Sequence, residues 1–94
     1  EEPLLADAQI ILYDAAWSTL GRYTTDGTHE PYCWTGLYPS FYYLEEINPA
    51  GYISTGPDLW AVPLNPGQEF TVQFGDQRSG TPASYYYLPL LYRQ

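Results

Sequence analysis

The chain has 94 residues, enough for one domain with a small core, and eleven acidic residues against three basic ones give it a net charge of −8. This balance repels phosphate backbones and anionic lipid heads, which argues against nucleic acid and membrane surfaces as partners. No apolar run approaches the roughly 20 residues of a membrane span, and the absence of methionine leads us to expect one module of a longer protein.

Turn-forming residues divide the chain into short segments rich in β-branched and aromatic residues, as is typical of strands. Nine prolines and eight glycines separate these segments, and no long stretch keeps the apolar spacing of a helix. The expected strands cover, in chain order, residues 8–14, 19–25, 31–35, 41–48, 59–64 and 69–75, with 85–92 as a candidate for a seventh. Six to seven short strands predict an all-β sandwich.

Alternation along the predicted strands identifies the core, because successive strand residues point to opposite faces of a sheet. In the strand over residues 69–75, Phe70, Val72 and Phe74 share one face, which must point inward. The same alternation directs a further set inward, namely Ile10, Leu12, Tyr32, Trp34, Tyr42, Leu44, Glu46, Trp60, Val62 and Leu64. Pro63 lies outward and lacks an N–H group, so its strand is expected at a sheet edge.

The end of the chain differs from the rest, because all eleven acidic residues lie within residues 1–76. Residues 77–84 are rich in small, polar and helix-breaking residues, which predicts a linker. Residues 85–94 are too apolar for a solvated tail. We expect a last edge strand, a sorting signal similar to the Tyr-Leu-Pro-Leu tails of some bacterial secreted proteins, or both, since the two are compatible. The segment lacks the Leu-Pro-x-Thr-Gly sortase signature.

An ordered series of landmarks runs through residues 8–76. It consists of Thr24-Thr25-Asp26, Tyr32-Cys33-Trp34-Thr35-Gly36-Leu37, Pro39, Tyr42, Leu44, Glu46, Asn48-Pro49-Ala50-Gly51-Tyr52, Ser54-Thr55, Asn65-Pro66-Gly67, Phe70, Val72 and Phe74-Gly75-Asp76. The series resembles the SdrD B-like (Cna-B-like) repeats of bacterial surface proteins. The resemblance assigns residues 1–76 to one such domain and implies an immunoglobulin-like or prealbumin-like β-sandwich that serves as a stalk, spacer or folding platform.

Some members of that family carry an internal Lys–Asn isopeptide bond, with a glutamate that shuttles protons. Glu46 matches the position of that glutamate, but the chain has no lysine, so the bond cannot form. A buried carboxylate without a partner is costly. We therefore expect Glu46 to play a structural role, with a hydrogen bond to a tyrosine hydroxyl or a backbone N–H and a raised pKa.

Some members also bind calcium, and the candidates here are Asp14, Asp26 and Glu30, which we expect to meet at one end of the sandwich. Calcium takes six to eight oxygen ligands, whereas the residues that follow Asp14 supply only backbone carbonyls. Any such site would therefore be of the weak, extracellular class. The alternative is that these acids are surface charges that keep the chain soluble. No other cofactor is predicted.

The residues that could support catalysis do not form a recognisable set. His29 and Cys33 are the only histidine and cysteine, whereas zinc needs three or four nitrogen or sulfur ligands. His29 is expected in an exposed loop and Cys33 on the outer face, without a base to activate its thiol. Glu45 and Glu46 point to opposite faces of one strand. We predict no catalytic residues and no enzymatic activity.

The abundance of aromatic residues suggests a second function. Phe41 and Tyr43 point outward on one predicted strand, and Trp17 and Tyr38 lie in or near turns, where flat rings can stack on sugars. We predict a non-catalytic structural or spacer domain of a bacterial cell-surface or secreted protein, such as an adhesin, which contacts neighbouring domains outside the cell. The alternative is a carbohydrate- or protein-binding module of an extracellular enzyme or adhesin, which a coplanar row of exposed rings would favour.

Overall fold

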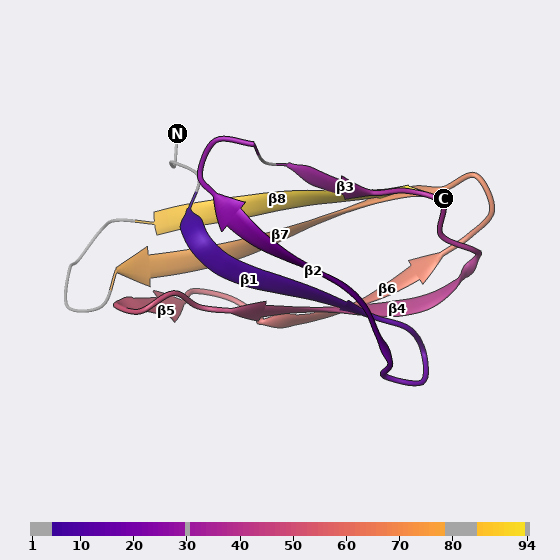
Figure 1. Cartoon of the computed structure of the whole chain (residues 1–94), viewed down its shortest axis with the longest axis horizontal. Helices are drawn as coiled ribbons and strands as arrows, with labels where there is room; N and C mark the ends of the chain where they lie inside the picture. The colour runs from indigo at the N-terminus through magenta and orange to yellow at the C-terminus, as the bar shows by residue number, and fades with distance from the viewer. Residues whose placement is uncertain (1–4, 30, 79–84, 94) are drawn as a thin grey trace.

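The chain forms eight strands in a computed structural model that describes residues 5–29, 31–78 and 85–93, with side chains described as far as Asp76 (Figure 1). No helix occurs in these residues. The strands are β1 (Ala6–Tyr13), β2 (Thr19–Asp26), β3 (Tyr32–Trp34), β4 (Ser40–Ile47), β5 (Tyr52–Ser54), β6 (Leu59–Leu64), β7 (Glu69–Arg78) and β8 (Tyr85–Arg93).

The strands assemble into two four-stranded sheets, with the orders β2-β1-β4-β6 and β3-β8-β7-β5. Neighbouring strands are antiparallel except for β3 and β8, which run parallel. Side chains from both sheets meet in one core, which confirms the predicted all-β sandwich. No helix of a length and apolarity suited to crossing a bilayer occurs in the described part of the chain.

The core consists of the inward-facing residues of β1, β4, β6 and β7, as alternation predicts. Its buried members are Leu5, Ala8, Ile10, Leu12, Tyr42, Leu44, Val62, Leu64, Val72 and Phe74, and Tyr32, Trp34 and Phe70 pack against them. Trp60 is the exception to the predicted set, since its side chain remains 36% exposed. It lies near the start of β6, the edge strand, where it lines a surface hollow with Thr55 and Thr71. Pro63 is exposed on the same edge strand, as expected.

β5 is a strand that the sequence did not predict, and its three residues are too few to show an alternating pattern. It pairs with the end of β7, where Ser54 lies opposite Asp76. β7 itself continues past Gly75 to Arg78, so this glycine does not end the strand.

β8 occupies residues that we expected to form an edge strand, a sorting signal or both. It pairs with β7 from Tyr85 to Arg93 and also with β3, so it lies inside its sheet rather than at the edge. Gln77 and Arg78 of the predicted linker belong to β7, and residues 79–84 lie outside the described residues. β8 is therefore part of the same sandwich as the strands before it.

Candidate functional site

The outer face of the β2-β1-β4-β6 sheet carries a group of aromatic side chains, here called the aromatic face, made of Tyr13, Trp17, Phe41 and Tyr43. Register brings the strand residues together, because Tyr13 lies opposite Tyr43 and Phe41 lies opposite Pro63. Phe41 is 54% exposed and Trp17 is 51% exposed. Apolar groups this exposed at neighbouring positions are typical of a contact surface.

Trp17 reaches this face from the turn between β1 and β2. The Asp14 carboxylate accepts hydrogen bonds from the backbone N–H groups of Ala16 and Ser18, both at 2.9 Å, and so holds the turn. Trp17 has a positive φ of 65°, a conformation that costs a non-glycine residue about 1–2 kcal/mol. Its indole stacks on Tyr43 with ring centroids 3.9 Å apart and an interplanar angle of 9°. A stacked pair contributes about 0.5–1.5 kcal/mol, which offsets much of the backbone strain.

Polar groups adjoin these rings. The Tyr13 hydroxyl donates a hydrogen bond of 2.7 Å to Glu45 Oε1, and this bond raises the pKa of Tyr13. Tyr13 also touches Trp17, with ring centroids 5.5 Å apart and a tilt of 58°. The rings of the aromatic face therefore contact one another at different angles instead of forming a coplanar row, and the Trp17 side chain remains half-exposed.

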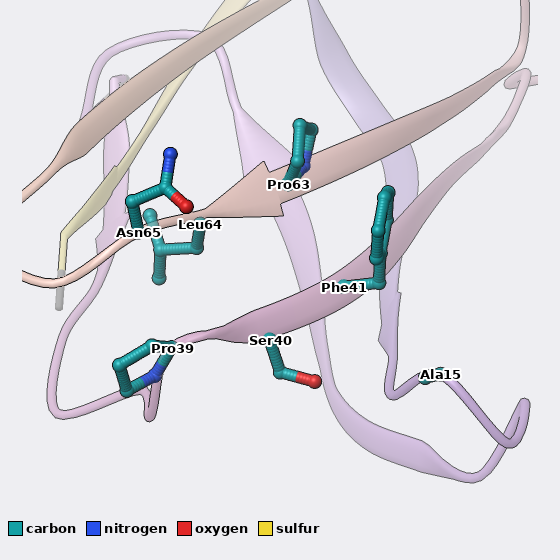
Figure 2. A pocket seen from close by; sticks show the side chains of 7 residues that line it. All are labelled: Ala15, Pro39, Ser40, Phe41, Pro63, Leu64 and Asn65. Atoms are coloured by element: carbon teal, nitrogen blue, oxygen red, sulfur yellow. The ribbon is translucent and has the colours of Figure 1, made fainter.

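A shallow hollow lies at the Phe41 end of the aromatic face. Figure 2 shows Phe41 and Pro63 on the neighbouring strands β4 and β6, with Pro39, Asn65 and Ala15 around the same hollow. None of the described residues that line it is ionisable. The hollow can accept an apolar group but holds no acid or base. Tyr38 lies in the loop before β4, is 84% exposed, and accepts the Tyr42 hydroxyl at its carbonyl oxygen.

The structure does not bring the predicted calcium ligands together. Asp14 precedes β2 and Asp26 ends it, so the two carboxylates lie at opposite ends of an eight-residue strand. Asp26 accepts the backbone N–H groups of Thr28 and His29, each at 2.8 Å, and these bonds hold the pKa of Asp26 below its usual range. Glu30 lies outside the described residues. Each of the two described acids stabilises its own turn.

His29 lies in an exposed loop, as the sequence indicates, and Cys33 lies in β3. The His29 side chain is 80% exposed and its Nδ1 contacts the Asp26 carboxylate. Cys33 is half-buried in β3, and its sulfur is 4.0 Å from the carbonyl oxygen of Trp34.

A second region of interest lies between the sheets, where one oxygen from each of Glu46, Asp58 and Asp76 falls within 4.8 Å of the other two. We call these three residues the carboxylate cluster. Glu46 is 4% exposed and Asp76 is fully buried, whereas Asp58 is exposed. Burial raises the pKa of Glu46 far above its usual range, and hydrogen bonds to Asp76 and Asp58 raise it further. Burial also raises the pKa of Asp76.

Sequence reasoning placed Glu46 inside but expected a tyrosine hydroxyl or a backbone N–H as its partner, whereas its side chain bonds to two other acids. Asp58 and Asp76 were not predicted as site residues. The signal for Asp76 was present, because it continues the inward series of Phe70, Val72 and Phe74 by one more step of two residues.

No protein-family model matches the chain, and neither curated proteins nor solved structures provide a match. The resemblance to SdrD B-like repeats therefore rests on the landmark residues alone, and family membership stays a prediction. The aromatic face and the carboxylate cluster are accordingly characterised by their own geometry.

Proposed function

We propose that the chain is a non-catalytic spacer module of a bacterial cell-surface or secreted protein. The observation that carries this proposal is the position of the first and last strands: β1 begins toward one end of the long axis, and β8 ends near the other (Figure 1). The molecule is elongated, with extents of 41 × 25 × 19 Å. The landmark residues that resemble SdrD B-like repeats support the same role.

Entry and exit at opposite ends determine what such a module does in a longer chain. Segments joined to β1 and to β8 are kept apart by the long axis of the sandwich and not by its width. β7 and β8 run side by side over most of that length, so their ladder of backbone hydrogen bonds lies along the direction of separation. The module therefore adds reach while its loops remain available for other contacts.

Direct repeats of the chain test this role. One, two and three copies joined by a short linker are compared by small-angle X-ray scattering. The maximum dimension is expected to grow by about the 41 Å long axis with each added copy. A matched series with a long Gly/Ser linker should lose this regular increment, because such a linker behaves as a flexible coil. Growth by only the 25 Å or 19 Å width would show that copies pack side by side and would contradict the proposal.

A second candidate function, binding of a carbohydrate, is favoured by Trp17. Glycine would occupy its positive-φ position with less strain, so the half-exposed indole is retained at a backbone cost. The exposed ring lies beside the bonded pair of Tyr13 and Glu45, which offers polar contacts for sugar hydroxyls. Because the rings do not form a coplanar row, this surface suits a single stacked sugar and ranks below the spacer role.

NMR titration with a panel of neutral oligosaccharides tests this candidate. Saturable shifts centred on Trp17 and Tyr13 are expected, lost in Trp17→Gly and kept in Trp60→Phe, which alters another partly exposed tryptophan. Absence of saturable shifts in the wild-type chain would leave the spacer role alone.

A further inference from the structure

One edge of the β3-β8-β7-β5 sheet is only partly covered. β7 has ten residues, whereas β5 pairs only with its last three (Figure 1). A hydrogen bond of 2.8 Å from the Thr55 N–H to the Gly75 carbonyl oxygen extends this pairing by one residue. The chain then leaves β7 and enters β6 of the opposite sheet. Residues 71–74 of β7, here called the open edge, are therefore left without a strand on that side.

The backbone groups of the open edge point away from β8. Gln73 lies opposite Pro89 of β8, and proline has no N–H group to exchange in a hydrogen-bonded pair. In an antiparallel ladder such a pair leaves its backbone groups directed outward, so the N–H and C=O groups of Thr71 and Gln73 face away from β8. The bond that Gly75 accepts from Thr55 follows the same alternation. Among the described residues, no backbone hydrogen bond reaches Thr71 or Gln73 from that side.

A surface hollow lies against the open edge. Thr71 and Gln73 line it from β7, and Thr55, Gly56 and Trp60 line it from the segment that leaves β7 for the opposite sheet. A strand that continued the line of β5 would occupy this hollow, where each residue takes up about 3.3 Å. An extended backbone is the partner that matches the alternating donors and acceptors of a sheet edge.

The charges around the hollow indicate the chemistry of that strand. None of the described residues that line it is charged. The exposed carboxylate of Asp58 lies in the loop between Gly56 and Trp60, and the chain has a net charge of −8. Arg22 is the only lysine or arginine whose side chain the structure describes, and it lies in β2, at the edge of its sheet opposite β6. A second copy would be repelled by its own negative charge, whereas a cationic segment is attracted.

We propose that the open edge of β7 binds an extended, cationic segment of a separate protein as an additional strand. The segment exchanges backbone hydrogen bonds with Thr71 and Gln73, an apolar side chain packs against Trp60, and lysine or arginine side chains are attracted to Asp58. This inference does not depend on the spacer role, because it concerns one side of the sandwich and not its two ends.

Amide hydrogen exchange followed by NMR tests the proposal. The probe is a capped peptide of alternating threonine and valine with a lysine at each end, and the control peptides carry glutamate instead of lysine or N-methyl groups on the backbone. In the free chain the amides of Thr71 and Gln73 should exchange faster than those of Val72 and Phe74, which face β8. The lysine peptide should slow exchange at Thr71 and Gln73 by about ten-fold or more, and neither control peptide should do so.

Charge substitutions at Gln73 provide a second measurement. Its side chain is exposed, so Gln73→Lys and Gln73→Glu are both expected to fold. Charges on paired strands interact, so Gln73→Lys should weaken binding of the lysine peptide by about two- to five-fold and Gln73→Glu should strengthen it by a similar factor. Gln9→Lys is the matched control, because it makes the same change at an exposed position of β1 in the other sheet and should bind like the wild-type chain.

Unchanged exchange at Thr71 and Gln73 with about 1 mM lysine peptide would overturn the proposal. Equal slowing by the N-methylated peptide would show that the peptide does not add as a strand. Equal binding of the glutamate peptide, or of the lysine peptide by Gln73→Lys, would overturn the assignment to a cationic segment. A dimer that protects the Thr71 and Gln73 amides without peptide would assign the open edge to a second copy.

Discussion

Glu45 and Glu46 are neighbours in β4, yet they belong to two different regions of the molecule. Glu45 lies on the aromatic face and accepts the Tyr13 hydroxyl, whereas Glu46 lies between the sheets among two other acids. Successive residues of a strand point to opposite faces of the sheet, so a shift of one position moves a side chain from the outer face to the interior. Exposed positions of the outer face, such as Phe41, can therefore vary at little cost to the fold, whereas each inner position is constrained by the opposite sheet.

The strongest test of this contrast exchanges one phenylalanine on each side. Phe74 is fully buried, so Phe74→Ala should lower the free energy of unfolding by about 3–5 kcal/mol. Phe41 is 54% exposed, so Phe41→Ala should change it by about 0.5 kcal/mol or less. Urea denaturation of both variants measures the difference. Similar losses would show that the aromatic face is covered, contrary to the contrast drawn here.

The pH dependence of stability sharpens the contrast between Glu45 and Glu46. Burial raises the pKa of Glu46, which faces the carboxylates of Asp76 and Asp58, above its ordinary value of 4.5. The folded chain then keeps a proton that the unfolded chain releases, so this stability is fully present below the unfolded pKa and is lost as pH rises toward the folded pKa. The free energy of unfolding should fall as pH rises from about pH 5 toward the folded pKa of about 10, by at most about 1.4 kcal/mol per pH unit for each proton.

Glu46→Gln should flatten that decline, because an amide does not titrate, and Glu45→Gln should leave it in place. Urea titrations of the three proteins across this range provide the measurement. Stability that rises with pH in the wild-type chain would mean that the cluster is ionised in the folded state.

The smallest expected effect on stability concerns Trp17. Its ring stabilises the fold by stacking on Tyr43, whereas its positive φ strains the backbone. Trp17→Ala loses the stack on Tyr43 and keeps the positive φ, whereas Trp17→Gly loses the stack and relieves the strain. The glycine variant should therefore be the more stable of the two by about 1 kcal/mol. Thermal unfolding compares them. Equal stability would mean that the turn adjusts its backbone when the indole is removed.

Alternation in the sequence was sufficient to predict most of the interior. It placed Val72 and Phe74 inside, together with Glu46, because the alternation can be read within a single strand without knowing its neighbours. It stopped one step short of Asp76, since Gly75 was taken as the end of a strand that continues to Arg78. The carboxylate cluster could not be predicted, because alternation says which face a residue occupies and not which strand of the other sheet it meets.

The change of composition after Asp76 does not mark the end of the sandwich, as the sequence analysis expected. The loss of acidic residues suggested a linker and a separate tail, but residues 85–93 form a strand with a neighbour on each side. Trp17 could not be placed on Tyr43 from the sequence either, because its positive φ arises in a turn held by Asp14 and follows no repeating pattern.

The place of β8 between β3 and β7 has a consequence for biosynthesis. β3 ends at Trp34 but pairs with residues 90–92, so its partner leaves the ribosome more than fifty residues later. Until then both β3 and β7 expose unpaired backbone edges, which are prone to join other chains. Closure of this sheet must therefore follow synthesis of almost the whole chain, and a ribosome that stalls before Tyr85 would leave a nascent product open to aggregation.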